Sequence, residues 1–172
     1  GHGISTTAMH LAAGYAAIAN GGRVVKPTLI KQSGPVLGKR VMREDVAAAS
    51  RRMLRAVVAG DDGTASFGDV EGYFVGGKTG TADKPKPGGG GYYKEKTITT
   101  FASMFPANDP RYVLIVTLDE PVETSSGKPR RTAGWTAVPV AAEMIRRVAP
   151  LLGMRPAIEP AELAGITLTS SN

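Results

Sequence analysis

The sequence predicts an α+β fold in which helices cover an antiparallel β-sheet. Three strand-like runs follow one another between residues 73 and 118, and a turn-rich pentapeptide separates the last two. Two amphipathic helical patterns precede these runs and one follows them. With 172 residues, 42% hydrophobic and 21% charged, the chain has the size and the apolar content of a single domain with a core.

Two helices are expected before the strands. The first spans 5–20, with Ser5 or Thr6 as its N-cap, and is followed by an extended segment at 23–30. Its apolar stripe consists of Ala8, Leu11, Ala12, Tyr15 and Ile18. The second helix spans 44–59, where acidic residues in the first turn oppose the helix dipole. Its apolar stripe consists of Val46, Ala49, Met53, Leu54 and Val57.

The strands and the last helix occupy the rest of the chain. A first strand is predicted at 73–82, and residues 83–96, with two prolines and four consecutive glycines, are expected to form a mobile connection. The runs 97–105 and 112–118 should pair as an antiparallel hairpin. A final helix at 138–149 should bury Ala141, Met144, Ile145 and Val148, with Pro150 ending it. The expected division is a domain at 1–152 and a C-terminal tail at 153–172.

Composition excludes several classes of function. The formal charge of +6 and pI near 9.7 suggest an anionic partner, but the basic residues are scattered and aromatic residues make up 6%, so no nucleic-acid partner is expected. The chain has no cysteine and two histidines, which argues against a metal site, and no cofactor is implied. No apolar run reaches the roughly 18 residues of a membrane span, so any export signal or anchor would lie upstream.

The string Lys78-Thr79-Gly80-Thr81-Ala82 is the most informative motif. In a strand, Thr79 and Thr81 project to one side while Lys78 and Gly80 project to the other. If the strand lies at a sheet edge, it can accept an extended peptide and present two hydroxyls and a cation to a carboxylate. The simpler alternative is a solvated lysine among ordinary strand-forming threonines. Gly76-Gly77 count against that alternative, since paired strand glycines mark a close approach.

These residues and their flanks resemble the class B penicillin-binding proteins, and most of all the septal D,D-transpeptidases that cross-link peptidoglycan. The resemblance covers residues 1–152. The segments that carry it are Gly3-Ile4-Ser5-Thr6-Thr7, Ala19-Asn20-Gly21-Gly22, Gly63-Thr64-Ala65, Val75 to Ala82, Thr100-Phe101-Ala102-Ser103, Asp109-Pro110-Arg111-Tyr112 and Ala133-Gly134-Trp135.

The family has three motifs, Ser-x-x-Lys at a helix start, Ser-x-Asn on a loop and Lys-Thr-Gly on a strand. Ser125-Ser126-Gly127-Lys128 matches the first literally, but it follows the third motif, and Gly127 and Pro129 disfavour a helix. Ser170-Ser171-Asn172 matches the second, in a polar terminus. Both are interpreted as chance matches. The chain is therefore expected to be the C-terminal part of a transpeptidase domain that lacks its nucleophile.

The resemblance also implies roles and partners. Lys78 and Thr81 are the expected catalytic residues, with the Thr81 N–H as an oxyanion donor, and Thr79, Gly80 and Thr81 the expected substrate-binding residues. The implied partners are peptidoglycan stem peptides, β-lactam antibiotics, the N-terminal part of the same domain and membrane proteins of the divisome. The implied location is the periplasmic side of the inner membrane.

Several alternatives remain open from the sequence. A D,D-carboxypeptidase, an elongation-specific synthase or a β-lactamase would share the Lys-Thr-Gly strand, and a non-catalytic sensor or interaction module could share the fold. Tyr92 and Tyr93 could line a substrate groove or anchor a loop.

Overall fold

The computed structural model describes residues 4–34 and 36–158. Its helices, in chain order, are α1 (Ala8–Ala19), α2 (Glu44–Ala59) and α3 (Ala137–Leu151), with short 3-10 turns η1 (Ser66–Gly68) and η2 (Pro87–Gly89). Its strands are β1 (Arg23–Val25), β2 (Leu37–Arg40), β3 (Gly76–Pro85), β4 (Tyr92–Phe105) and β5 (Tyr112–Asp119).

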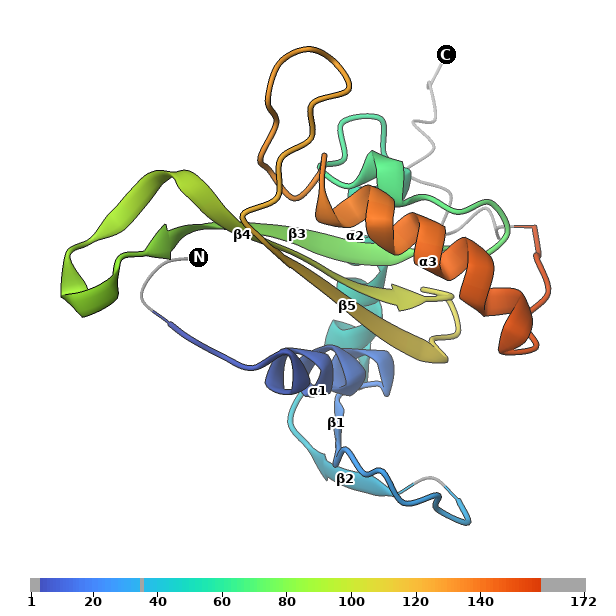
Figure 1. Cartoon of the computed structure of the whole chain (residues 1–172). Coiled ribbons are helices and arrows are strands. Elements are labelled where there is room, and N and C mark those ends of the chain that lie inside the picture. The colour runs from blue at the N-terminus through green and yellow to red at the C-terminus, as the bar shows by residue number, and fades with distance from the viewer. Residues whose placement is uncertain (1–3, 35, 159–172) are drawn as a thin grey trace, which may run out of the picture.

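The main sheet is antiparallel, with the strand order β3-β4-β5, and β1 and β2 form a separate two-stranded ribbon. Helices α1 and α3 lie on opposite faces of the main sheet, while α2 packs beside β3 (Figure 1). The predicted α+β class is therefore confirmed. The principal core lies between the sheet and α3, where Phe101, Val138 and Ile145 are completely buried.

Helix α2 begins and ends where the sequence predicted, and Val57 of its predicted apolar stripe packs against the core, but two other members of that stripe are exposed. Val46 and Met53 are 38% and 68% exposed, whereas Ala47, Arg55 and Val58 are buried. The buried arginine explains the error. Arg55 donates to Asp69 Oδ1 at 2.9 Å and to the Val75 carbonyl at 3.0 Å, so a charged side chain occupies the inner face that periodicity assigns to apolar residues.

The other helices differ from prediction at their ends. Helix α1 begins at Ala8, and Thr7, rather than Ser5 or Thr6, caps it by accepting from the His10 N–H. Its predicted stripe is at most half-buried, and Ala8 is exposed. Helix α3 continues through Pro150 to Leu151. Met144 and Val148, predicted to be buried, are 41% and 39% exposed and border an apolar groove next to β5.

The strands differ from prediction in their bounds and in their number. The first strand begins at Gly76 rather than Tyr73, because Phe74 has a φ of 47° and breaks the extended conformation. Of the segment 23–30, only Arg23–Val25 is a strand, and it pairs with β2, which the sequence did not predict.

The boundary between a domain and a tail at 152/153 stays a prediction. Met154 is buried in the core, and residues 159–172 lie outside the described part of the chain.

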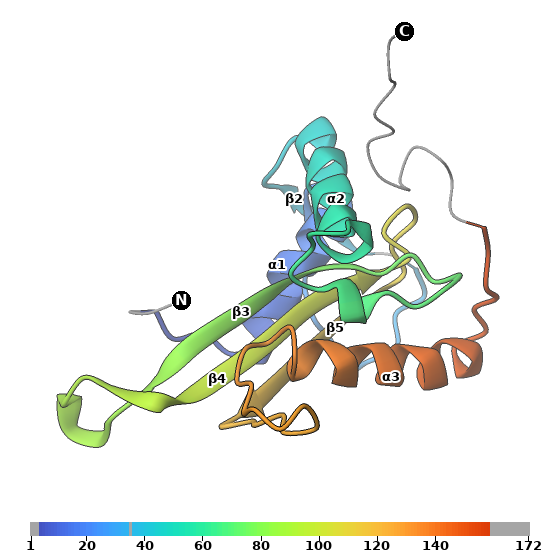
Figure 2. The same cartoon turned by 90° about the horizontal axis from the view of Figure 1, so that it is seen from above.

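The predicted mobile connection at 83–96 is mostly a β-hairpin. Strand β3 runs to Pro85 and β4 starts at Tyr92, so the hairpin projects well beyond the helices, with η2 at its tip (Figure 2). Lys84 pairs with Asp119 at 2.7 Å and with Glu120 at 2.9 Å, and Lys96 pairs with Glu120 at 3.0 Å. These ion pairs hold the base of the hairpin to the end of β5.

Candidate functional site at the edge of β3

The Lys-Thr-Gly motif lies in the middle of β3, which is an edge strand of the described sheet. Lys78, Thr79, Gly80 and Thr81 pair in register with Ala102, Phe101, Thr100 and Thr99 of β4. On its other side, β3 meets no further strand among the described residues. Its outward backbone groups are therefore available to an added peptide strand.

Two glycines let β3 approach its neighbours at the start of the motif. A Cβ on Gly77 would lie 2.7 Å from the Phe101 ring and 2.7 Å from the Ala102 carbonyl oxygen. A Cβ on Gly76 would lie 3.1 Å from the Ala107 side chain. The close approach predicted from the glycine pair is confirmed, and it places Lys78 directly after a buried segment.

Lys78 and Thr79 come together, although their side chains leave opposite faces of the strand. Lys78 is exposed, and its Nζ turns back to donate to the Thr79 carbonyl at 3.2 Å and to Thr79 Oγ1 at 3.1 Å. An ammonium group can only donate, so Thr79 Oγ1 accepts and keeps its own proton for another partner. This is a cation beside a hydroxyl that can donate, the combination that suits a carboxylate.

Thr64 is a residue near the site whose role the sequence did not reveal. Its Oγ1 lies 3.1 Å from Thr79 Oγ1, although it belongs to the loop after α2. The Gly63-Thr64-Ala65 string was noticed as part of a resemblance, but nothing in a loop sequence indicates a contact 15 residues away. Thr79 therefore has Thr64 on one side and Lys78 on the other.

Thr81 is held by a different part of the chain. The Ala133 N–H, just before α3, donates to Thr81 Oγ1 at 3.0 Å. Thr79 and Thr81 thus both contact loops flanking the α3 side of the sheet, in agreement with the predicted alternation. Gly80 has open space around it, since a Cβ there would meet only the Thr100 carbonyl oxygen, at 3.9 Å.

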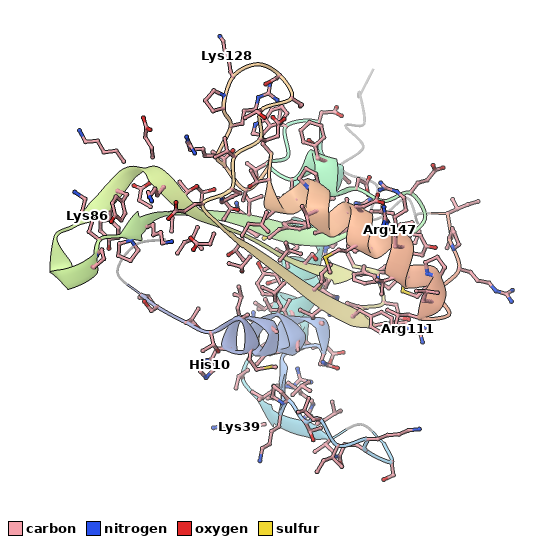
Figure 3. All side chains as sticks on the ribbon, in the orientation of Figure 1. His10, Lys39, Lys86, Arg111, Lys128 and Arg147 are labelled. Atoms are coloured by element: carbon pink, nitrogen blue, oxygen red, sulfur yellow. The ribbon has the colours of Figure 1, made fainter. Side chains whose placement is uncertain are left out.

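The literal Ser-x-x-Lys string lies in a loop. A β-bridge between Glu123 and Arg130 closes this loop, and Gly127 has a φ of 76°. Figure 3 shows Lys128 at the far end of the loop, away from the sheet. The expectation that this string is not helical is confirmed. The Ser-x-Asn string at 170–172 lies outside the described residues.

The two tyrosines of the hairpin have different surroundings. Tyr93 lies between two ammonium groups, with its ring centroid 5.8 Å from Lys86 Nζ and 5.2 Å from Lys96 Nζ. Tyr92 is 43% exposed and borders a cavity of about 560 Å³ under the α1 face of the sheet. Tyr93 therefore fits the anchoring interpretation, whereas the cavity beside Tyr92 is lined by none of Lys78, Thr79 and Thr81, so a substrate groove at Tyr92 stays a prediction. The described residues contain no group of three or more acidic or histidine side chains suited to a metal ion.

Residues 1–143 match the family described as the penicillin binding protein transpeptidase domain. The chain belongs to this family. It is 36% identical over 163 residues to a probable peptidoglycan D,D-transpeptidase FtsI of Caulobacter vibrioides, covering 90% of this chain and 28% of that protein. It is 34% identical over 168 residues to the stage V sporulation protein D of Bacillus subtilis, covering 91% of this chain and 25% of that protein.

Solved structures agree with the family assignment. The transpeptidase domain of penicillin-binding protein 3 from Burkholderia pseudomallei superposes with a TM-score of 0.78 at 34% identity, covering 92% of this chain and 46% of that one. Penicillin-binding protein 3 of Mycobacterium tuberculosis, solved in complex with ampicillin, gives 0.74 at 32% identity, covering 94% and 38%. These relatives identify the chain as part of a class B transpeptidase domain, as the sequence predicted.

The penicillin-binding transpeptidase chain spans 25–28% of the length of the first curated relatives. Within its described part, none of the helices is long and apolar enough to cross a membrane.

Proposed function

We propose that this chain provides the Lys-Thr-Gly edge of a septal peptidoglycan D,D-transpeptidase. The observation that carries the proposal is the open edge of β3, where Lys78 Nζ lies 3.1 Å from Thr79 Oγ1 and Thr81 stands two residues further on. The names of the relatives support the same activity. No observation favours a carboxypeptidase, an elongation-specific synthase, a β-lactamase or a sensor.

The reaction proceeds through an acyl-enzyme. A serine outside these 172 residues attacks the carbonyl carbon between two D-alanines, a C–O bond forms, the C–N bond breaks, and the last D-alanine leaves with a proton on its amine. An amine of a neighbouring stem peptide then attacks the ester carbon. The new amide forms as the C–O bond breaks, and a proton returns to the serine oxygen.

The residues of β3 take separate parts in this scheme. Lys78 supplies positive charge that draws in the substrate carboxylate and assists proton transfer. The hydroxyls of Thr79 and Thr81 hold that carboxylate, and Gly80 leaves room beside it. The Thr81 N–H is one of two oxyanion donors, and losing one such donor costs about 2.7 to 4 kcal/mol of transition-state stabilisation.

The same site is proposed to accept β-lactams, which mimic the D-alanine dipeptide and leave the serine blocked. We also propose that the whole protein is anchored in the inner membrane, with this domain on the periplasmic side and with membrane proteins of the divisome as partners. The first motif and the remaining strands would come from the N-terminal part of the same domain.

Covalent labelling with a fluorescent penicillin tests the proposal. In the complete transpeptidase domain, Lys78→Ala is expected to abolish labelling, because it removes the cation beside Thr79. Lys128→Ala is the matched control and should label normally, because Lys128 belongs to the chance Ser-x-x-Lys match, in a loop away from the sheet. Normal labelling of Lys78→Ala, or loss of labelling in Lys128→Ala, would contradict the proposed roles. The 172-residue chain alone should remain unlabelled until it is mixed with the N-terminal part.

A further inference from the structure

We propose that Thr136 is a positioning residue that fixes the Thr81 hydroxyl as a hydrogen-bond donor toward the substrate carboxylate. It acts through a hydroxyl clamp, by which we mean Thr97, Thr99 and Thr136, that ties the segment before α3 to β4. The inference rests on the proposed function, because it assigns a further residue to the same carboxylate site.

The clamp consists of buried hydroxyls with defined partners. Thr97, Thr99 and Thr136 are 8%, 0% and 7% exposed. Thr97 Oγ1 donates to the Arg131 carbonyl at 3.1 Å. Thr136 Oγ1 lies 3.0 Å from Thr99 Oγ1 and 3.0 Å from the Thr132 carbonyl oxygen. Thr136 is the donor in both contacts, so its single proton is shared between Thr99 Oγ1 and the Thr132 carbonyl oxygen.

The clamp lies directly beneath the candidate site. Thr99 is the cross-strand partner of Thr81, so the clamp holds the segment 131–136 against the strand pair that carries the motif. Within that segment, Ala133 is completely buried and directs its N–H at Thr81 Oγ1. A Cβ on the neighbouring Gly134 would lie 2.8 Å from the Thr64 carbonyl oxygen, so the segment also packs closely against the loop that contacts Thr79.

The direction of the Ala133 hydrogen bond has a chemical consequence. A backbone N–H can only donate, so it occupies a lone pair of Thr81 Oγ1 and leaves the Thr81 proton for another acceptor. A carboxylate can only accept. With the Ala133 N–H in place, Thr81 meets the carboxylate as a donor. If the segment moves away, the hydroxyl can rotate and present a lone pair to the carboxylate, which is repulsive.

The test compares a ligand that has a carboxylate with one that does not. Acylation rates of the complete domain are measured with benzylpenicillin and with its methyl ester, and their ratio reports the carboxylate contact alone. Thr136→Val, which removes the hydroxyl at constant shape, should lower this ratio roughly tenfold, because a hydrogen bond to a charged acceptor is weakened. Thr136→Ser should restore the ratio, since it restores the hydroxyl.

Thr117→Val is the matched control. Thr117 and Thr100 form another cross-strand hydroxyl pair, at 3.0 Å, on the opposite, α1 face of the same sheet. Removing this pair should leave the ratio of acid to ester unchanged. A purely structural effect of losing a threonine hydroxyl would slow acylation by both ligands in either variant.

A second variant covers the case in which Thr136→Val fails to fold because Thr99 is left without a partner. Replacing both partners, as in Thr99→Val with Thr136→Val, leaves no orphaned hydroxyl and is close to neutral for stability. This double variant should also show the lower ratio. An unchanged ratio in the folded double variant would overturn the inference. Failure of the parent protein to be acylated by either ligand would instead overturn the proposed function.

Discussion

Gly77 and Gly80 lie three residues apart on β3, yet their surroundings differ. Gly77 faces the Phe101 ring and the Ala102 carbonyl, both 2.7 Å from where a Cβ would lie, whereas Gly80 has open space on the side that a methyl group would occupy. The first glycine is therefore required by packing. The second is left for a ligand, in line with the proposed substrate site.

Alanine substitutions should separate these two roles. Gly77→Ala should destabilise the protein by roughly 1 to 3 kcal/mol, because the added methyl overpacks the strand pair. Gly80→Ala should change stability by less than about 1 kcal/mol but slow acylation by penicillin, because the methyl group enters the proposed substrate space. Denaturant unfolding and labelling rates measure the two effects. Equal destabilisation by both changes would contradict this assignment.

The chemistry of the site residues could be predicted from the sequence, but their partners could not. Strand alternation and the motif identified Lys78, Thr79 and Thr81. Thr64 and the Ala133 N–H were missed because each comes from a loop whose position depends on the tertiary fold. Arg55 was missed for a related reason, since its burial depends on Asp69 and the Val75 carbonyl rather than on any property of α2 itself.

At the scale of elements, the hairpin formed by β3 and β4 is the largest departure from prediction. Four consecutive glycines indicated a mobile loop, but the flanking strands extend toward the tip, and ion pairs to the end of β5 hold their base. These ion pairs join residues 24 to 36 positions apart in the sequence. The local content of glycine and proline cannot predict such distant contacts. The same network orders the chain just beyond Thr81.

The anchoring of the hairpin should depend on pH. Hydrogen bonds from Lys84 and Lys96 lower the pKa of Glu120 below the ordinary 4.5, so its contribution is complete above that value and is lost as the pH falls through the lowered pKa. The hydrogen bonds that Lys84 donates to Asp119 and Glu120 raise the pKa of Lys84 above the ordinary 10.5, so its contribution is complete below 10.5 and is lost as the pH rises through the raised pKa.

Backbone NMR dynamics of the hairpin tip, measured from about pH 7 to pH 3, test the predicted loss of the Glu120 ion pairs in acid. The tip should become more mobile as Glu120 is protonated, and Glu120→Gln should be mobile already at neutral pH. Glu95→Gln is the control, because Glu95 takes part in none of the ion pairs found among the described residues. A tip equally ordered in Glu120→Gln would show that the ion pairs do not anchor it.

In the molecule as a whole, half of the exposed large apolar side chains among the described residues lie in the N-terminal third of the chain. Leu29, Ile30 and Met53 are 104%, 75% and 68% exposed. The ribbon of β1 and β2 projects below α1, away from the main sheet (Figure 1). Exposed apolar surface of this kind is typical of an interface.

The isolated chain is therefore expected to self-associate or to bind the N-terminal part of its domain. Size-exclusion chromatography of the chain alone should show oligomers, and adding the N-terminal part should shift them to a defined complex. A monomer that unfolds cooperatively by itself would contradict this prediction.

Prediction from sequence succeeded for the order of the elements and for the family, and it failed where distant segments meet. The three strands and the three helices followed from periodicity and turn residues. Strand β2, the exposed face of α1 and the long hairpin did not, because each depends on a partner that is distant in sequence. The motif strand was correctly identified even though its start was displaced by three residues, from Tyr73 to Gly76.

We propose, above all, that the edge of β3 binds the acidic end of a cell-wall peptide. A crystal structure of the complete domain acylated by ampicillin tests it most directly. We predict that the ampicillin carboxylate accepts hydrogen bonds from Thr79 Oγ1 and Thr81 Oγ1, at about 2.5 to 3.0 Å, with Lys78 Nζ beside Thr79. A carboxylate bound elsewhere, with another element of the protein paired to the β3 edge, would contradict the claim.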